Sequence, residues 1–286
     1  MPYLIAAILC SASIALLFKR SESANFNRYA VTTANYAVAT LIAALLIAAT
    51  WDNKPSYISI TGSVRSIARM LLDGAPLPPR ASLIWSFTSG AAAGLVFFLG
   101  FIYYQLAIRR HGVSLSGAFS KLGILVPMSL SLVFWREYPT GLQWLGISLA
   151  VASILIVNWP FGRAKRPDKS APPLGRLQLP GSVDTKGSSA FKPTLLLLAL
   201  FGGLAEFSNK IFQKYGYQVD LPLFLVAVFG SAFALSFLVT WRLRSPVHTR
   251  DLLMGAAVGI PNLFASYFLI QDRKSTRLNS SHESPS

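Results

Sequence analysis

Long hydrophobic runs separated by short polar turns make up most of the chain. Eight of these runs are long enough, or nearly so, to cross a bilayer as a helix, which takes about 20 residues for about 30 Å of hydrocarbon. They cover residues 2–18, 29–51, 84–108, 113–135, 141–159, 194–212, 221–241 and 252–270. The pattern predicts an all-α polytopic membrane protein.

The first run, residues 2–18, is also compatible in length with a signal peptide. A signal peptide carries its basic residues before the hydrophobic segment. Here Lys19 and Arg20 follow the run, and no basic residue precedes it. We therefore interpret it as a membrane span.

Two connections between the runs are long. Residues 52–83 contain hydrophobic side chains at helical spacing, with Arg65 and Arg69 off their stripe. The stripe consists of Ile60, Val64, Ile67 and Leu71. A short helix in the membrane interface and an unstructured loop both fit this pattern. Residues 159–193 are rich in Pro, Gly, Ser and basic residues, which predicts a flexible linker between five spans and three.

Composition excludes an ordinary soluble domain. Hydrophobic residues make up 53% of the 286 residues and charged residues 13%, against about 25% charged in a typical soluble protein. The mean hydropathy is +0.49. A single cysteine, Cys10, excludes a disulfide framework and a metal cluster built on cysteine.

The formal charge of +15 comes mostly from loops and span ends. The linker contributes Arg163, Lys165, Arg166, Lys169, Arg176, Lys186 and Lys192. Nucleic-acid binding needs a folded basic face with stacking aromatic residues, which the linker lacks, so we predict no nucleic-acid partner. Basic residues favour the odd-numbered loops, and the positive-inside rule then places those loops in the cytoplasm and the N-terminus outside.

The chain changes character after Ile270. Residues 272–282, with the sequence DRKSTRLNSSH, resemble the in-frame translation of a widely used short-read sequencing adapter. A chance match of this length is negligible. We therefore expect residues 272–286 to be an artefactual tail that replaces native sequence after Gln271.

A short motif occurs twice. Gly90 and Gly94 in the third span reappear as Gly255 and Gly259 in the eighth, each pair separated by three small or apolar residues. Such pairs are also common packing faces of membrane helices. If the eighth span repeats the third, the chain has a five-plus-five plan whose last two helices are missing. An odd number of spans per repeat inverts the second half, as in many secondary transporters.

Residues 104–158 carry the most recognisable motifs, namely GVSLSGAFSKLGILVP, FWRE and QWLG. The mid-helix proline Pro127, the turn at Glu137 and the helix-opening Gly146 resemble the fourth and fifth helices of an EamA-type module of the drug/metabolite transporter superfamily. Asn35 and Tyr36 in the second span resemble a branch of that group. The resemblance covers residues 1–158 well and residues 194–271 more loosely.

The resemblance implies two inverted repeats around a central cavity, with the fifth and tenth helices peripheral. Residues 1–158 would form the first repeat and residues 194–271 a partial second one. It implies alternating-access transport of a small metabolite or drug-like compound across the cytoplasmic membrane of a bacterium. Without its last two helices, the printed chain is expected to be inactive.

Ionisable residues inside spans cost about 2.5–3.5 kcal/mol each at mid-bilayer and so mark candidate sites. In the sixth span, Glu206, Asn209, Lys210 and Gln213 fall at i, i+3, i+4 and i+7, on one helix face. We interpret Glu206 as a site for a substrate cation or a coupling proton, neutralised by Lys210 when empty. The alternative is a structural Glu206–Lys210 pair with Lys210 extending to the interface.

Other candidates stand alone. Lys121 in the fourth span could bind an anionic group or extend to the surface. Pro127 and Pro261, the latter followed by Asn262, predict helix kinks. Tyr103 could line a polar cavity or bond between helices.

Tyr36 shares a face of the second span with Tyr29, Thr33 and Thr40, with Asn35 adjacent. This face could line a polar cavity or make hydrogen bonds between helices.

The sequence has no catalytic motif: His111 and His248 lie in loops, without metal-binding or nucleophile spacing, and no Walker-type loop is present. We therefore predict no enzyme, no cofactor and no metal. Transport would be coupled to a proton or cation gradient or to the gradient of the substrate. The alternative to a transporter is a non-transporting membrane protein that acts as a partner or sensor through its basic linker.

Reading the gene again past the codon for Ile270, from fresh genomic DNA, tests the tail. We expect two further hydrophobic segments, the first with a mid-helix proline and a Glu-bearing turn after it, because the repeat requires counterparts of the fourth and fifth spans. A stop codon at that point would contradict both the tail and the repeat.

Overall fold

A computed structural model of the chain describes residues 2–49, 60–73, 77–136, 138–158, 193–244 and 246–282. All regular structure within these ranges is helical. The helices are α1 (Pro2–Ser23), α2 (Arg28–Ala49), α3 (Ile60–Asp73), α4 (Pro79–His111), α5 (Val113–Leu122), α6 (Leu125–Trp135), α7 (Gly141–Asn158), α8 (Pro193–Tyr215), η2 (Gln218–Asp220), α9 (Leu221–Arg242) and α10 (Thr249–His282).

Seven helical segments of the described residues are long and apolar enough to cross a membrane. They are Pro2–Ser23, Arg28–Ala49, Ala81–His111, Val113–Trp135, Pro193–Tyr215, Gln218–Arg242 and Thr249–Gln271. The predicted all-α class is therefore confirmed, and the seven helices are consistent with a multi-pass membrane protein by length and composition. The predicted fifth span forms α7, and the count of eight spans stays a prediction. Two predicted features, the linker and the turn at Glu137, lie outside the described residues.

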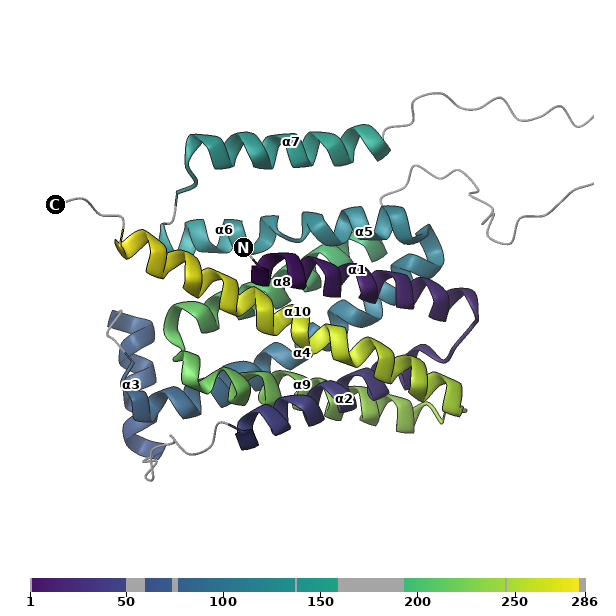
Figure 1. Cartoon of the computed structure of the whole chain (residues 1–286), viewed down its shortest axis with the longest axis horizontal. Helices are drawn as coiled ribbons and strands as arrows, with labels where there is room; N and C mark the ends of the chain where they lie inside the picture. Colours follow the sequence, from purple (N-terminus) through teal and green to yellow (C-terminus); the bar gives the residue numbers. More distant parts are fainter. Residues whose placement is uncertain are drawn as a thin grey trace, which may run out of the picture.

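The long connection before α4 contains a helix, α3, which decides between the two alternatives that its sequence left open. Met70 of α3 is buried against Leu77 and Ala81, at the start of α4. Val64 of the predicted apolar stripe is instead 55% exposed. The face that packs on the bundle is therefore centred on Met70, and α3 stands across one end of the molecule (Figure 1).

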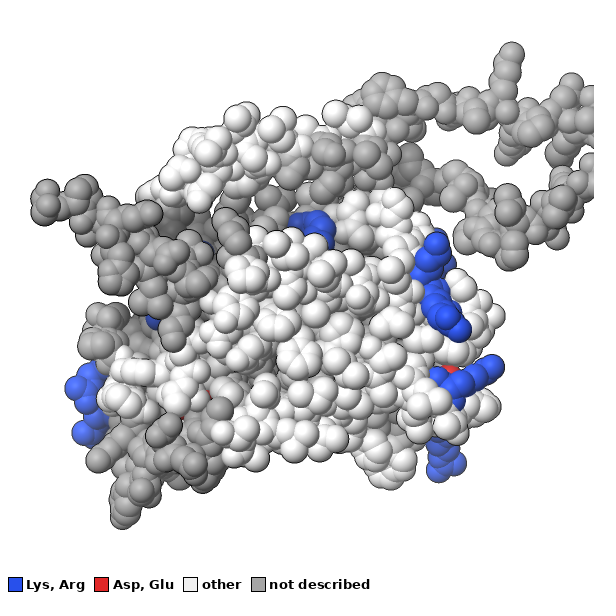
Figure 2. All heavy atoms as spheres, viewed as in Figure 1, with Lys and Arg blue, Asp and Glu red and all other residues white. Residues whose placement is uncertain are grey.

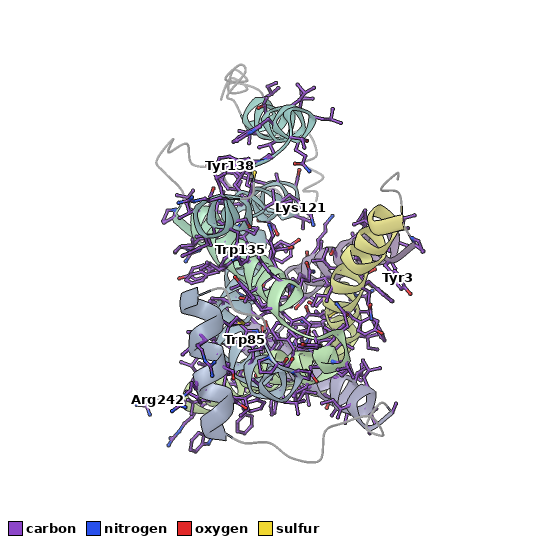
Figure 3. The ribbon with its side chains drawn as sticks, turned by 90° about the vertical axis from the view of Figure 1, so that its left-hand side faces the viewer. Tyr3, Trp85, Lys121, Trp135, Tyr138 and Arg242 are labelled. Carbon is purple, nitrogen blue, oxygen red and sulfur yellow. The ribbon has the colours of Figure 1, made fainter. Side chains whose placement is uncertain are left out.

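The long helices form a chain of neighbours. In order, α1 packs on α10, α10 on α2, α2 on α9, α9 on α4, α4 on α8, and α8 on α5 and α6. Seen end-on, they follow an arc with α5 and α6 at one end and α10 with α1 at the other (Figure 3). Helix α7 lies outside the arc, beside α5 (Figure 1), and its Leu142 and Leu149 side chains are exposed.

Aromatic side chains fill the centre of the arc, where α2, α4 and α9 meet. The Tyr36 ring lies 6.2 Å from the Phe229 ring, and Phe97 packs edge-on against Phe229 at 5.9 Å. Phe212 of α8 stacks on Phe224 of α9 at 4.4 Å. These contacts tie the middle helices into one core.

The fourth predicted span is broken into α5 and α6. Pro127 has no N–H to bond the carbonyl of Gly123, and its ring crowds that carbonyl, so the helix is interrupted four residues earlier. The Gly123 carbonyl instead accepts the backbone N–H of Val126 at 3.0 Å and lies against Gly203 of α8. By contrast, α10 continues through Pro261 without interruption.

The repeated glycines lie at helix contacts. Gly90 and Gly94 of α4 face α9, and a Cβ added at Gly90 would lie 2.7 Å from the carbonyl oxygen of Phe224. Gly255 and Gly259 of α10 face α2, and a Cβ added at Gly259 would lie 2.6 Å from the carbonyl oxygen of Asn35. Both contacts therefore depend on the absence of a side chain.

Exposed basic residues gather at one end of the bundle, at the right in Figure 2. This end carries the α1–α2, α4–α5 and α9–α10 turns. Its exposed basic side chains are Lys19, Arg20, Arg109, Arg110, Arg242, Arg244 and Arg250. The arrangement is consistent with the odd-numbered loops facing one side of the membrane, and the orientation itself stays a prediction.

Two adjacent glycines of α8 offer a matched test of the packing. A Cβ at Gly203 would meet Gly123 and, at 2.6 Å, Val126, whereas a Cβ at Gly202 would meet nothing within 4 Å. We expect Gly203→Ala to destabilise the protein by about 1–3 kcal/mol through overpacking. Gly202→Ala should be neutral or stabilising, because alanine favours a helix by up to about 1 kcal/mol.

The measurement is the thermal unfolding midpoint of each variant in the same detergent. Equal midpoints for the two variants would show that α6 and α8 do not approach as closely as described.

Candidate functional site

Four buried polar side chains line α2 where it faces α4 on one side and α10 on the other. We call Thr32, Asn35, Gln105 and Asn262 the amide cluster; each is at most 3% exposed. The Gln105 side-chain amide donates to Thr32 Oγ1 at 2.6 Å, and the Asn262 amide donates to Asn35 Oδ1 at 3.1 Å. The predicted candidate Asn262 thus meets the second span through Asn35, the neighbour of Tyr36.

The amide cluster retains unused hydrogen-bonding capacity. Asn35 Nδ2 and Gln105 Oε1 are fully buried and have no hydrogen-bond partner among the described residues. One is a donor and the other an acceptor. Leaving such a group unsatisfied costs about 1–3 kcal/mol, so each calls for an explanation.

Three further residues of the predicted polar face of α2 are hydrogen-bonded. The Tyr36 hydroxyl donates to the carbonyl of Phe97 at 2.7 Å, and its ring is fully buried. Thr33 Oγ1 shares a hydrogen bond with Thr240 Oγ1 of α9 at 2.9 Å, and Thr40 bonds back to its own helix. These groups join helices through hydrogen bonds and aromatic packing.

The polar face predicted on α8 lies between α6 and α10. Lys210 Nζ donates to Ser131 Oγ of α6 at 2.7 Å, and Gln213 Nε2 reaches the carbonyl of Leu269 in α10 at 3.5 Å. Asn209 is buried, and its Oδ1 has no hydrogen-bond partner among the described residues. Glu206, one turn earlier, is exposed.

Trp135 at the end of α6 caps this face (Figure 3). The ammonium groups of Lys210 and Lys214 lie 5.4 and 4.2 Å from the centre of its ring, and its Nε1 donates to the Tyr215 hydroxyl at 2.8 Å. An indole face attracts a cation by about 0.5–2 kcal/mol. Ser131 and Trp135 did not stand out in the sequence, because their contacts join segments far apart in the chain.

Two predicted candidates lie apart from these groups. Tyr103 stacks on Phe201 of α8, with ring centres 5.4 Å apart. Lys121 is exposed near the end of α5 (Figure 3). The described contacts bring neither residue to the amide cluster or to the α8 face.

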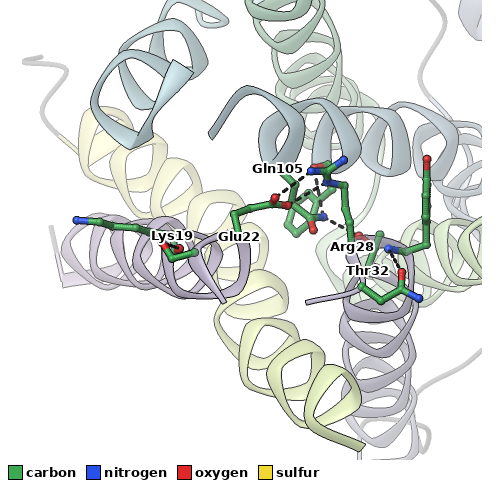
Figure 4. A network of polar contacts seen from close by, with 9 residues as sticks. Lys19, Glu22, Arg28, Thr32 and Gln105 are labelled. Atoms are coloured by element: carbon green, nitrogen blue, oxygen red, sulfur yellow. Dashed lines mark hydrogen bonds and ion pairs between the residues drawn. The ribbon is translucent and has the colours of Figure 1, made fainter. Parts of the chain in front are cut away.

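Buried carboxylates hold the turns together at both ends of the bundle, and the sequence did not single them out. At the basic end, Asp251 of α10 is 1% exposed and accepts the backbone N–H groups of Asn27 and His248 at 3.1 and 3.0 Å. Glu22 and Arg28 form a two-pronged ion pair beside it, with both oxygens at 2.9 Å (Figure 4).

At the opposite end, Asp220 before α9 is 3% exposed and accepts the Ser82 hydroxyl at 2.6 Å. The Tyr217 hydroxyl donates to the carbonyl of Leu77 at 2.9 Å. Each end therefore has a polar clasp between segments far apart in the chain: the α1–α2 and α9–α10 turns at one end, and the start of α4 and η2 at the other. We call these the Asp251 clasp and the Asp220 clasp.

Among the described residues no group of three or more His, Cys, Asp and Glu side chains is placed to hold a metal ion. Comparison with models of protein families finds no match, and no curated protein sequence matches the chain.

The Asp251 clasp yields a stability test. Asp251→Leu removes the acceptor of two part-buried backbone N–H groups, so we expect a total loss of about 1–3 kcal/mol. Asp251→Asn keeps only one of the two acceptor oxygens, because an NH₂ group replaces the other, so it should lose less than Asp251→Leu but more than nothing.

Thermal unfolding in detergent compares the two variants with the parent chain. Equal losses in both variants would show that the charge of Asp251, and not its acceptor geometry, stabilises the turn.

Proposed function

We propose that this chain is a secondary transporter of small organic solutes, of the EamA-like type, built from two inverted repeats. In this proposal α1, α2 and α4 correspond to α8, α9 and α10. Three features of the helix packing support the correspondence, and each uses different contacts.

The glycine contacts are the first feature that supports the correspondence between the two halves. Gly90 lies against Phe224 and Ala227, and Gly255 lies against Val31 and Ala34. The sequence interval from Val31 to Phe224 equals that from Ala34 to Ala227. The two glycine contacts thus use corresponding residues of α9 and α2.

The second glycine of each pair continues the pattern. Gly94 lies against Val228 and Ser231, whereas Gly259 lies against Asn35 and Val38. These partners are separated by the same interval as the previous ones. A chance pair of small-residue motifs gives no reason for such a fixed register.

The order of neighbouring helices is the second feature that supports the correspondence between the two halves. The contacting helices form the series α1, α10, α2, α9, α4, α8. Replacing each helix by its counterpart (α1 by α8, α10 by α4, α2 by α9, and the reverse) gives the same series in the opposite order. Each contact between two helices is therefore matched by a contact between their counterparts. Helices α5, α6 and α7 have no counterpart in the second half among the described residues.

The central contact supports inversion. Tyr36 and Phe229 are separated by that same interval, and they pack on each other, as residues beside a two-fold axis do. Thr33, before Tyr36, meets Thr240, after Phe229, so α2 and α9 run in opposite directions. An axis between them would lie in the membrane plane.

Inverted repeats of this kind bind solutes between their halves near mid-membrane and expose the site to each side in turn. The meeting of Tyr36 with its counterpart is the observation that carries the proposal. The buried polar groups near this contact, rather than any catalytic arrangement, are what a solute would use.

Solute flux into liposomes tests the function, using the gene product completed beyond residue 271 and a panel of labelled amino acids and cationic drug-like compounds. We expect saturable, gradient-dependent uptake of at least one class. Glu206→Gln should reduce it at least tenfold without preventing insertion, because the carboxylate is the proposed cation or proton site.

Arg242→Gln, at the exposed basic end, and deletion of part of residues 163–186 serve as controls that keep transport. Full uptake by Glu206→Gln would remove the role of Glu206. Loss of activity on linker deletion, with no uptake of any solute by the intact protein, would favour a partner or sensor protein.

A further inference from the structure

The amide cluster has an apolar counterpart in the other half of the molecule. Under the repeat proposed above, Thr32, Asn35, Gln105 and Asn262 correspond to Leu225, Val228, Ile270 and Phe97. These four counterparts are at most 7% exposed, and all belong to the main hydrophobic core. Corresponding positions of one packing plan are therefore polar on one side and apolar on the other.

The apolar side acts as an internal control for what packing requires. It shows that hydrophobic side chains can fill these positions, so the helix contacts do not need amides there. Burying an amide without a full set of partners is unfavourable by about 1–3 kcal/mol. The unused Asn35 Nδ2 and Gln105 Oε1 therefore weaken the fold relative to its apolar counterpart. Groups that cost stability without serving packing are typical of binding sites.

The cluster also has a definite chemical character. It offers an N–H donor and a carbonyl acceptor, and its members carry no charge. The nearest charge along α2 is Arg28, one turn before Thr32, and Arg28 is neutralised by Glu22 at 2.9 Å. An ionic group would find no counter-charge here, whereas a hydroxyl or carboxamide could use both unsatisfied atoms.

We propose that the amide cluster is the solute-recognition site of this transporter and binds an uncharged hydrogen-bonding group, a hydroxyl or a carboxamide. The inference rests on the proposed function and its repeat. Such a group accepts from Asn35 Nδ2 and donates to Gln105 Oε1, and it thereby satisfies both buried atoms. Because the cluster is fully buried behind the Asp251 clasp, the structure corresponds to a closed state.

Binding is measured directly, without transport, on the 286-residue chain. The side-chain amide signals of ¹⁵N-asparagine are recorded by NMR, with Asn35 identified by the signal lost in Asn35→Val. Acetamide is titrated as an uncharged probe, with acetate and methylammonium as charged probes. We expect acetamide alone to shift the Asn35 signal saturably, and Gln105→Ile to reduce that shift at least tenfold.

Stability provides the second measurement. Asn35→Val and Gln105→Ile introduce the residues of the apolar counterpart, so their unfolding midpoints should equal or exceed that of the parent. Thr33→Val, which removes the bond to Thr240 outside the cluster, should lower the midpoint while keeping the acetamide shift.

Three results would overturn the proposal. The first is an Asn35 signal that does not shift with acetamide, which is expected if the cluster binds only an ordered water. The second is an equal shift with the charged probes. The third is an unfolding midpoint for both cluster variants below that of Thr33→Val, which would show that the cluster is structural. Absence of flux in liposomes together with an acetamide-specific shift would instead reject the transporter and retain the site.

Discussion

Close packing of helix on helix through glycine is the constraint on which the rest of this structure depends. Inside a bilayer the lipid tails are as apolar as leucine, so burying hydrophobic side chains gives helices little reason to associate. Association then depends on van der Waals contact, which falls off within a fraction of an ångström. Gly94 of α4 and Gly259 of α10 bring their helices near enough to touch the backbones of α9 and α2. The register fixed there determines which polar side chains meet farther along the same helices.

That register explains why the amide cluster exists on only one side. Gly259 sets α10 against α2 at Asn35, and three residues later Asn262 reaches the Asn35 side chain. In the corresponding contact, Gly94 sets α4 against α9 at Val228, and Phe97 packs on Phe229 instead. The backbone contact is therefore shared, while the side chains decide whether a core or a polar site follows from it.

The hydrophobic pattern predicted most of the fold, because a membrane span is a local property of about 20 consecutive residues. Seven predicted spans coincide with helices of suitable length and composition, and the stripe around Ile67 predicted α3 as one of two alternatives. Pro127 predicted a kink in the fourth span, but the break lies four residues earlier, at the carbonyl with which a proline cannot make the usual helical hydrogen bond. Such details follow from backbone geometry once a helix is in place.

The candidate sites were predictable only in part. The spacing of Asn209, Lys210 and Gln213 placed them on one face of a helix, but nothing local specifies that Ser131 and Trp135 lie opposite. The spacing of residues in the sequence likewise did not predict that Asp220 and Asp251 connect distant turns. These partners are brought together by packing between distant segments, and pairing across such distances is not encoded in a single helical period.

Under the proposed transport function, the glycine contacts would also limit which parts of the molecule move against each other. Each contact joins a helix of one proposed repeat to a helix of the other, so separating the repeats as rigid bodies would break both. Two units keep them intact: α1, α10 and α2 on one side, and α9, α4 and α8 on the other. They meet along α2 and α9, through Tyr36 and Phe229.

The amide cluster straddles this boundary, because Asn35 and Asn262 belong to one unit and Gln105 to the other. A group bound to both Asn35 and Gln105 would therefore bridge the units and stabilise their closed arrangement relative to an open one. A ligand shifts a conformational equilibrium only by its difference in affinity for the two states. Under the proposed function, a solute bound where these units meet would therefore have the largest effect on their arrangement.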